Sequence, residues 1–331
     1  MTQTTETAPA AGAGRGGSRS LDLLLGQLRW VALALAITIP AILNPNFRSY
    51  DNLQGFLQSI GVLLILAMGQ SFVLLIAGID LSVGAVLAMG SVVLAELMHH
   101  GWPLWGAVLA TLAAGLGIGL LSGASVLILK IPSFIVTFAF MGIAYAAGLV
   151  ISGGDRIGLP AGSALPQLAT GEIFGVPYQI VLALILLVVG TLALQHLTIG
   201  RHLYAVGGNP EAARLSGLSI RRATLVAFGL SGLFASIAAV VYTARVVSGN
   251  PIGGSNLNLQ SIAAAVIGGV SLFGGRGSLV GACFGALLYS LIENVLNLYN
   301  VNPNITEIVA GVIVLLAGLI NVLTDAKRAK A

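Results

Sequence analysis

The sequence is built mainly from apolar runs that are long enough to cross a lipid bilayer as helices, which takes about 20 residues each. Hydrophobic residues make up 57% of the 331-residue chain and charged residues only 8%, whereas soluble domains carry about a quarter charged residues. Because the bilayer interior offers no hydrogen-bond partners, such runs must form helices that satisfy their own backbone groups. The sequence therefore predicts an all-α polytopic membrane protein.

We expect about ten transmembrane helices in a membrane domain of residues 27–324. The predicted spans are residues 27–43, 53–77, 82–98, 104–129, 133–151, 178–197, 223–247, 259–273, 279–296 and 307–323. A disordered tail of residues 1–26 is predicted before them, and a basic tail of residues 325–331 after them. In the fourth span Gly115, Gly119 and Gly123 recur every four residues, a spacing that lets another helix pack closely.

The positive charges predict how these spans are oriented. With ten spans, only three of the 15 basic residues, Arg48, Arg156 and Arg245, fall in outer segments. Since basic residues concentrate in cytoplasmic segments, we expect both termini in the cytoplasm. Topology thereby explains the net charge of +4, and no nucleic-acid partner is expected.

The polar segment 200–222, GRHLYAVGGNPEAARLSGLSIRR, separates two apolar runs and is predicted to be a cytoplasmic loop. Asn209 can cap a helix, Pro210 suits its first position, and Glu211 in its first turn complements the helix dipole. The helix continues through Ala212, Ala213, Arg214 and Leu215, and Gly217 is placed to end it. A helix of roughly two turns is marginal alone. It is therefore either an ordinary solvated loop helix or a docking element held by a partner.

A second group of polar residues lies in or beside the apolar spans. Asp80 and Ser82 interrupt an apolar stretch, so the helix is expected to break there. Asp80 either caps the start of the next helix or takes part in gating or packing. Further candidates for a gate or solute pathway are Gln70, Thr137, Asn256 and Asn258, although most polar side chains in spans make helix–helix hydrogen bonds. A pathway of uncharged polar groups suits a neutral, hydrogen-bonding solute.

Motifs for several kinds of chemistry are absent from the sequence. It contains no Gly-x-Ser-x-Gly, no His-Glu-x-x-His and no Gly-Lys-Ser/Thr of a phosphate loop, so we expect a non-catalytic chain with no cofactor of its own. The four histidines lack metal-ligand spacing, and the single cysteine excludes an internal disulfide. The charged residues Asp80, Glu96, Lys130, Arg245 and Glu293 fall near predicted span ends, which argues against an ion-coupled carrier. Any energy for transport must then come from another protein.

Several strings resemble one family of transport proteins. Glu211-Ala212-Ala213 followed by Gly217 resembles the Glu-Ala-Ala-x-x-x-Gly loop of ABC importer permeases. The longer string GRHLYAVGGNPEAARLSG resembles the ribose-type sugar permeases of that superfamily in particular, as do AGIDLSVGA, PSFIVT and SGNPIGGSNLN. The resemblance covers about residues 44–323.

This resemblance implies a permease subunit of the bacterial cytoplasmic membrane. In this family the loop is a coupling helix, here residues 209–214 with Gly217, and it docks on a separate ATPase that binds ATP and Mg²⁺. Two copies of the permease form the pathway, and an extracytoplasmic binding protein delivers a monosaccharide or related polyol.

Three alternatives stay open. ABC permeases for branched-chain amino acids share part of the glycine pattern, so a branched-chain amino acid is an alternative substrate. An ATP-independent facilitator or channel would conduct solute with no ATPase present. A membrane scaffold would show no solute flux under any condition.

Overall fold

In a computed structural model, the described part of the chain comprises residues 31, 33–302, 304–309, 311–312, 315–316 and 318–319. Its long helices are α2 (Tyr50–Leu75), α3 (Val83–His99), α4 (Leu104–Leu129), α5 (Ser133–Ser152), α7 (Tyr178–His196), α10 (Ile220–Val246) and α12 (Leu279–Leu298). Its shorter helices are η1 (Pro45–Arg48), α6 (Gln167–Thr170), α8 (Thr198–Gly208), α9 (Pro210–Leu215) and α11 (Leu257–Ile267), and a further apolar helix spans Leu33–Leu43. Two-residue strands pair antiparallel, β1 (Ile157–Gly158) with β4 (Ser248–Gly249) and β2 (Glu172–Ile173) with β3 (Val176–Pro177).

The predicted all-α membrane fold is confirmed. Within the described residues, 6 helices are long and apolar enough to cross a membrane, namely α2, α4, α5, α7, α10 and α12. The apolar helices α3, α11 and Leu33–Leu43 are shorter. The predicted tails, 1–26 and 325–331, lie outside the described residues, and the predicted spans 27–43 and 307–323 lie only partly within them. The count of ten spans and the cytoplasmic termini therefore stay predictions.

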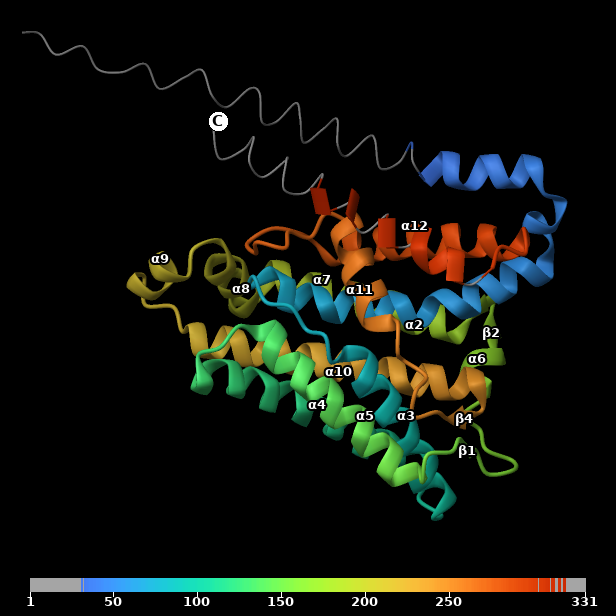
Figure 1. The fold of residues 1–331 in the computed structure, drawn as a ribbon, viewed down its shortest axis with the longest axis horizontal. Coiled ribbons are helices and arrows are strands. Elements are labelled where there is room, and N and C mark those ends of the chain that lie inside the picture. Colours follow the sequence, from blue (N-terminus) through green and yellow to red (C-terminus); the bar gives the residue numbers. More distant parts are fainter. Residues whose placement is uncertain are drawn as a thin grey trace, which may run out of the picture.

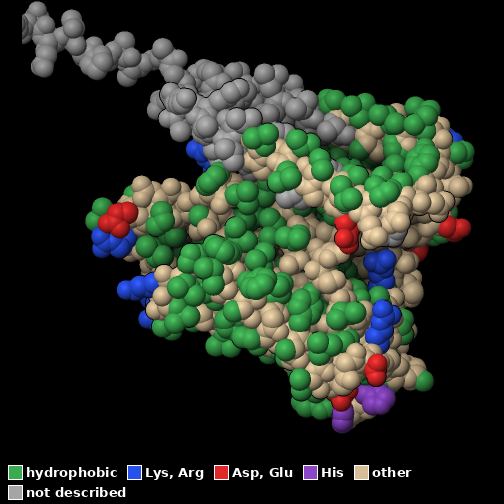
Figure 2. All heavy atoms as spheres, viewed as in Figure 1, with side chains coloured by type: hydrophobic (Ala, Val, Ile, Leu, Met, Phe, Trp, Pro, Cys, Tyr) green, Lys and Arg blue, Asp and Glu red, His purple; other side chains and the backbone are tan. Residues whose placement is uncertain are grey.

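The helices α2 and α10 form the centre of the bundle. In their most apolar windows, 78% of α2 and 72% of α10 is buried, compared with 22% for each of α4, α5 and α7. These outer helices turn apolar side chains such as Leu120, Phe138 and Val188 to the surface, and hydrophobic side chains cover much of the face in Figure 2. A packed interior with an apolar exterior is the arrangement that a lipid environment requires.

The glycine repeat of α4 accepts a close neighbour, as its spacing predicts. A Cβ atom on Gly115 would lie 2.6 Å from the Gly232 carbonyl oxygen, and one on Gly119 would overlap the Phe228 carbonyl oxygen. Residue numbers rise along the α4 glycines while those of their α10 partners fall. The helices α4 and α10 therefore pack antiparallel along this seam (Figure 1). Only residues without a side chain allow this backbone separation.

The loops predicted to face opposite sides of the membrane lie at opposite ends of the bundle. In Figure 1, α8 and α9 lie at one end, which we call the α9 end, and β1 and β4 lie at the other, which we call the β end. The Gly274–Gly275 turn contacts Gly207 and Gly208 of α8, so it belongs to the α9 end. At the β end, the long loop after α5 is tied to residue 249 through the β1–β4 pairing. The segregation fits the predicted alternation of inner and outer segments.

Two of the predicted elements were wrong in extent. The polar segment 200–222 contains α8 as well as α9, because Leu203 and Val206 are buried at helical spacing. The predicted span 259–273 is only the short helix α11, which ends at Ile267. Gly268 after it packs against the Gly281 carbonyl of α12, and Gly269 adopts φ +85°. A left-handed glycine of this kind ends a helix.

The close packing of α4 against α10 predicts that adding one methyl group lowers stability at some glycines of α4 and not at others. We expect Gly119→Ala to destabilise the protein by about 1–3 kcal/mol, as overpacking does, because the new Cβ would meet the α10 backbone. Gly117→Ala is the matched control, since a Cβ there has nothing within 4 Å. Thermal unfolding in one detergent compares the two, and equal melting temperatures would contradict the packing account.

Candidate functional site

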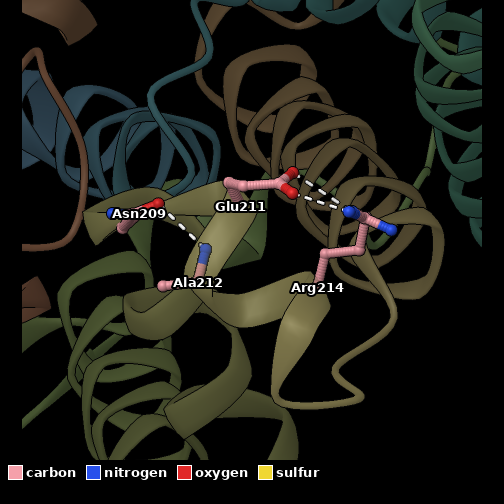
Figure 3. A network of polar contacts seen from close by, with 4 residues as sticks. All are labelled: Asn209, Glu211, Ala212 and Arg214. Atoms are coloured by element: carbon pink, nitrogen blue, oxygen red, sulfur yellow. Dashed lines mark hydrogen bonds and ion pairs between the residues drawn. The ribbon is translucent and has the colours of Figure 1, made fainter.

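The helix α9 is short and capped (Figure 3), and all its residues except the buried Ala213 are exposed. The Asn209 side chain accepts a hydrogen bond from the Ala212 N–H at 3.0 Å, and Pro210 occupies the first turn. Gly217, at φ +78°, follows the helix, and the Leu218 N–H donates to the Ala213 carbonyl at 3.0 Å. The helix, its cap and its glycine end are therefore confirmed as the sequence predicts them.

A charge pair lies along the exposed face of α9. The Arg214 Nη2 lies 2.6 Å from Glu211 Oε1, and its Nε donates to Oε2 at 3.1 Å (Figure 3). The hydrogen bond from Arg214 holds the pKa of Glu211 below its usual value. Any stabilisation from this pair is present above the ordinary glutamate pKa and is lost as the pH falls through the lowered one. An exposed pair contributes little to stability, so its main effect is on the surface that α9 presents.

The neighbouring helix α8 fixes α9 to the bundle. Gly207 lets the α8 backbone approach the Leu75 carbonyl at the end of α2 so closely that a Cβ atom would overlap it. The same carbonyl accepts a hydrogen bond from the Gly275 N–H at 2.8 Å. The Tyr204 hydroxyl donates to the Gly277 carbonyl at 2.9 Å. A displacement of α8 would therefore act directly on the end of α2 and on the turn before α12.

After Leu75 the chain leaves helical geometry and runs as an irregular connection to the start of α3 at Val83 (Figure 1). We call residues 76–82 the unwound segment. Its Asp80 and Ser82 are buried, with 1% and 2% of their surface exposed. Irregular backbone inside a membrane protein persists only where protein groups replace the missing helical hydrogen bonds.

Two side chains of α5 supply part of these hydrogen bonds. Ser133 Oγ accepts a hydrogen bond from the Ile79 N–H at 3.0 Å. Thr137 Oγ1 accepts one from the Leu81 N–H at 3.1 Å and can donate to the Ile79 carbonyl at 3.2 Å. The first turns of α5 thus replace helical partners on one side of the segment.

The opposite side of the unwound segment is satisfied from α2 and α11. With its amide oriented so that both groups are satisfied, the Gln70 nitrogen donates to the Asp80 carbonyl at 3.1 Å and its oxygen accepts from the Asp80 N–H at 3.3 Å. The Asn258 amide nitrogen lies 3.4 Å from the Leu81 carbonyl. Each backbone polar group from Ile79 to Leu81 therefore has a side-chain partner. The irregular backbone consequently leaves none of these groups without a hydrogen bond in an apolar setting.

The Asp80 carboxylate bonds within the segment to Ser82, the residue before α3, and links the segment to Ser231 of α10. Its Oδ1 accepts from the Ser82 N–H at 2.9 Å and from the Ser82 hydroxyl at 2.6 Å, while its Oδ2 accepts from the Ser231 hydroxyl at 2.7 Å. The Ser82 contact is the turn before α3, one of the two roles considered from the sequence, and the Ser231 contact is a packing contact with α10, which belongs to the other. Among the described residues no cation pairs with Asp80, so hydrogen bonds alone hold this side chain.

The structure thus brings most of the predicted pathway residues together and leaves one apart. Gln70, Asp80, Ser82, Thr137 and Asn258 all contribute to the unwound segment. Asn256 instead bonds to exposed Glu307. The sequence does not indicate that Ser133 and Ser231 bond to the unwound segment, or that Tyr204 bonds α8 to the turn before α12. The first two are small hydroxyl residues in apolar helices, a signal that is common in such helices and does not name its partner. No group of three potential metal ligands occurs within the described residues.

The fold defines a polytopic membrane protein, and comparison with known proteins assigns its family. The chain belongs to the family described as branched-chain amino acid transport system / permease component, whose model matches residues 52–318. Over 301 residues it is 36% identical to the ribose import permease protein of Escherichia coli, covering 90% of this chain and 94% of that protein. It is 36% identical over 301 residues to the L-arabinose transport system permease protein of Escherichia coli, covering 91% and 90%. It is 33% identical over 290 residues to the fructose import permease protein of Rhizobium meliloti, covering 85% and 80%.

These relatives confirm the resemblance to ribose-type ABC permeases that the sequence motifs indicate. Together with the apolar helices, they make the chain a multi-pass protein of the bacterial inner membrane. No solved structure matches the chain.

The unwound segment predicts that one hydroxyl group carries a measurable share of stability. We expect Thr137→Val to lower the free energy of unfolding by about 1–3 kcal/mol, because the Leu81 N–H and the Ile79 carbonyl would lose their hydrogen-bond partner. Thr137→Ser keeps the hydroxyl and should cost less. Thermal unfolding of both variants is the measurement, and a valine variant as stable as the serine variant would contradict the proposed role.

Proposed function

We propose that this chain is the transmembrane permease subunit of an ABC importer that moves a monosaccharide or related polyol into the cell, driven by a separate ATPase. The observation that carries this proposal is α9, a capped and exposed helix fixed through α8 to the end of α2. A docking helix must be accessible to its partner and must also transmit force to the pathway. The position of α9 meets both requirements.

The solute class is inferred from the relatives. Those compared above are named for ribose, L-arabinose and fructose, although the family description names branched-chain amino acids. Relatives at similar identity serve pentoses and a hexose, so they support a sugar without selecting one. A branched-chain amino acid is the alternative solute, since the family description names it.

In the proposed assembly, the ATPase docks at the α9 end and holds ATP and Mg²⁺, while an extracytoplasmic binding protein docks at the β end. The long loop between α5 and α7, braced by β1–β4 pairing, is the surface we assign to the binding protein. A second copy of the chain completes the pathway. Closure of the ATPases would displace α9, and α8 would pass the motion to α2 and the unwound segment. The mechanism is alternating access by rigid movement of packed helices.

The docking role of α9 is tested by reversing one charge. We expect Glu211→Lys to remove the ATPase from the purified complex, because it breaks the Arg214 pair and places a like charge beside it. The measurement is the amount of ATPase that co-purifies with the tagged permease in mild detergent, with membrane insertion checked in parallel.

The matched control is Asp155→Lys, the same charge reversal in an exposed loop at the β end. It should leave ATPase co-purification unchanged. A Glu211→Lys permease that still retains the ATPase and imports solute normally would contradict the coupling assignment.

A further inference from the structure

A cavity of about 520 Å³ lies among α2, α10, α11 and α12. It is within the range of about 300–1,000 Å³ that is usual for small-molecule sites. Its rim includes the exposed residues Asp51, Arg245 and Asn297 near the β-end termini of their helices, and its deepest residues on α2 are Val62 and Leu63. From residue 52 to residue 63 of α2 the rise is about 16 Å at 1.5 Å per residue. The cavity therefore extends from the β end into the bundle.

The cavity wall is polar although the helices that form it are apolar. Besides Asp51 and Asn297 of the rim, the polar side chains are Asn52 and Ser59 of α2, Tyr242 and Arg245 of α10, Gln260 of α11, and Ser290, Glu293 and Asn294 of α12. Those of α12 recur at helical spacing and so share one face. Polar and charged groups inside membrane proteins are costly and usually face a water-filled cavity or mark a solute pathway.

The charged groups of this wall are not neutralised by each other. Among the described residues neither Arg245 nor Glu293 forms an ion pair. The Gln260 amide donates to the Glu293 carboxylate at 3.0 Å. The Asn52 and Asn294 amides bond to each other at 2.9 Å. The cavity thus presents one cationic donor, Arg245, and two anionic acceptors, Glu293 in the wall and Asp51 at the rim, together with neutral amides and hydroxyls.

We infer that this cavity is a binding site of the permease itself for a neutral polyhydroxylated solute, with Glu293 and Arg245 as its main hydrogen-bonding groups. This inference rests on the proposed function and specifies where the sugar binds after delivery. A carboxylate accepts hydrogen bonds from solute hydroxyls, while guanidinium and amide groups donate to solute oxygens. Neutral polar groups outnumber the charges, so a polyol fits better than an amino-acid zwitterion with an apolar side chain.

The test uses a single cysteine inside the cavity. Cys283 is the only native cysteine and is replaced by alanine, after which Ser59→Cys is introduced. We expect a membrane-impermeant methanethiosulfonate added to intact cells to label Cys at position 59 slowly. Millimolar ribose, fructose or L-arabinose should slow this labelling further. His99→Cys, exposed at the end of α3 and outside both the cavity and the loop assigned to the binding protein, is the matched control and should be labelled at the same rate with or without sugar.

A second variant tests the assigned groups. Adding Glu293→Gln should raise the sugar concentration that gives half-protection by about three- to tenfold, the loss expected for one weakened hydrogen bond. No protection by any of these sugars, with the ATPase still bound through α9, would overturn the cavity site and leave the proposed function standing. Protection by leucine and not by sugars would overturn the solute class itself. A change of oligomeric state in Glu293→Gln, without a change in protection, would assign the side chain to subunit contacts and overturn its role here.

Discussion

The unwound segment between α2 and α3 is the feature on which the rest of the structure depends. From Ile79 to Leu81 its backbone groups have side-chain partners in place of helical hydrogen bonds, and each unsatisfied buried group there would cost free energy. Thr137, Gln70 and Asn258 supply the missing partners, and Asp80 ties the segment to Ser231. One irregular stretch thus connects α2, α3, α5, α10 and α11. Movement of any of these helices would have to exchange those hydrogen bonds for others.

The unwound segment lies directly beyond the contact through which α8 meets the bundle. The Leu75 carbonyl, last in α2, faces Gly207 of α8 and accepts the Gly275 N–H. A force on α9 is therefore delivered where the regular helix ends and a rearrangeable segment begins. The cavity at the β end and the proposed docking helix α9 lie toward opposite ends of the bundle from this segment, an arrangement that suits the alternating access we propose.

The sequence predicts most of the local structure of this protein and little of its long-range contacts. The long helices follow from apolar runs, and the start and end of α9 follow from Asn209, Pro210 and Gly217, since these signals lie within a few residues of one another. The partners of the unwound segment do not, because Ser231 is 151 residues and Asn258 177 residues from the groups they bond. The helix α8 was missed because its apolar positions lie inside a polar segment. The early end of α11 combines a local signal, the left-handed Gly269, with a long-range contact, the packing of Gly268 against the Gly281 carbonyl of α12.

The central claim is that the permease moves its solute only when a separate ATPase drives it through α9. The most direct measurement is uptake of labelled ribose, fructose and L-arabinose into proteoliposomes that contain the permease and its binding protein, with and without the ATPase. The account predicts accumulation of one of these sugars only when the ATPase is present and ATP is supplied on its side. Equal flux from the permease alone would contradict the account and identify an ATP-independent facilitator.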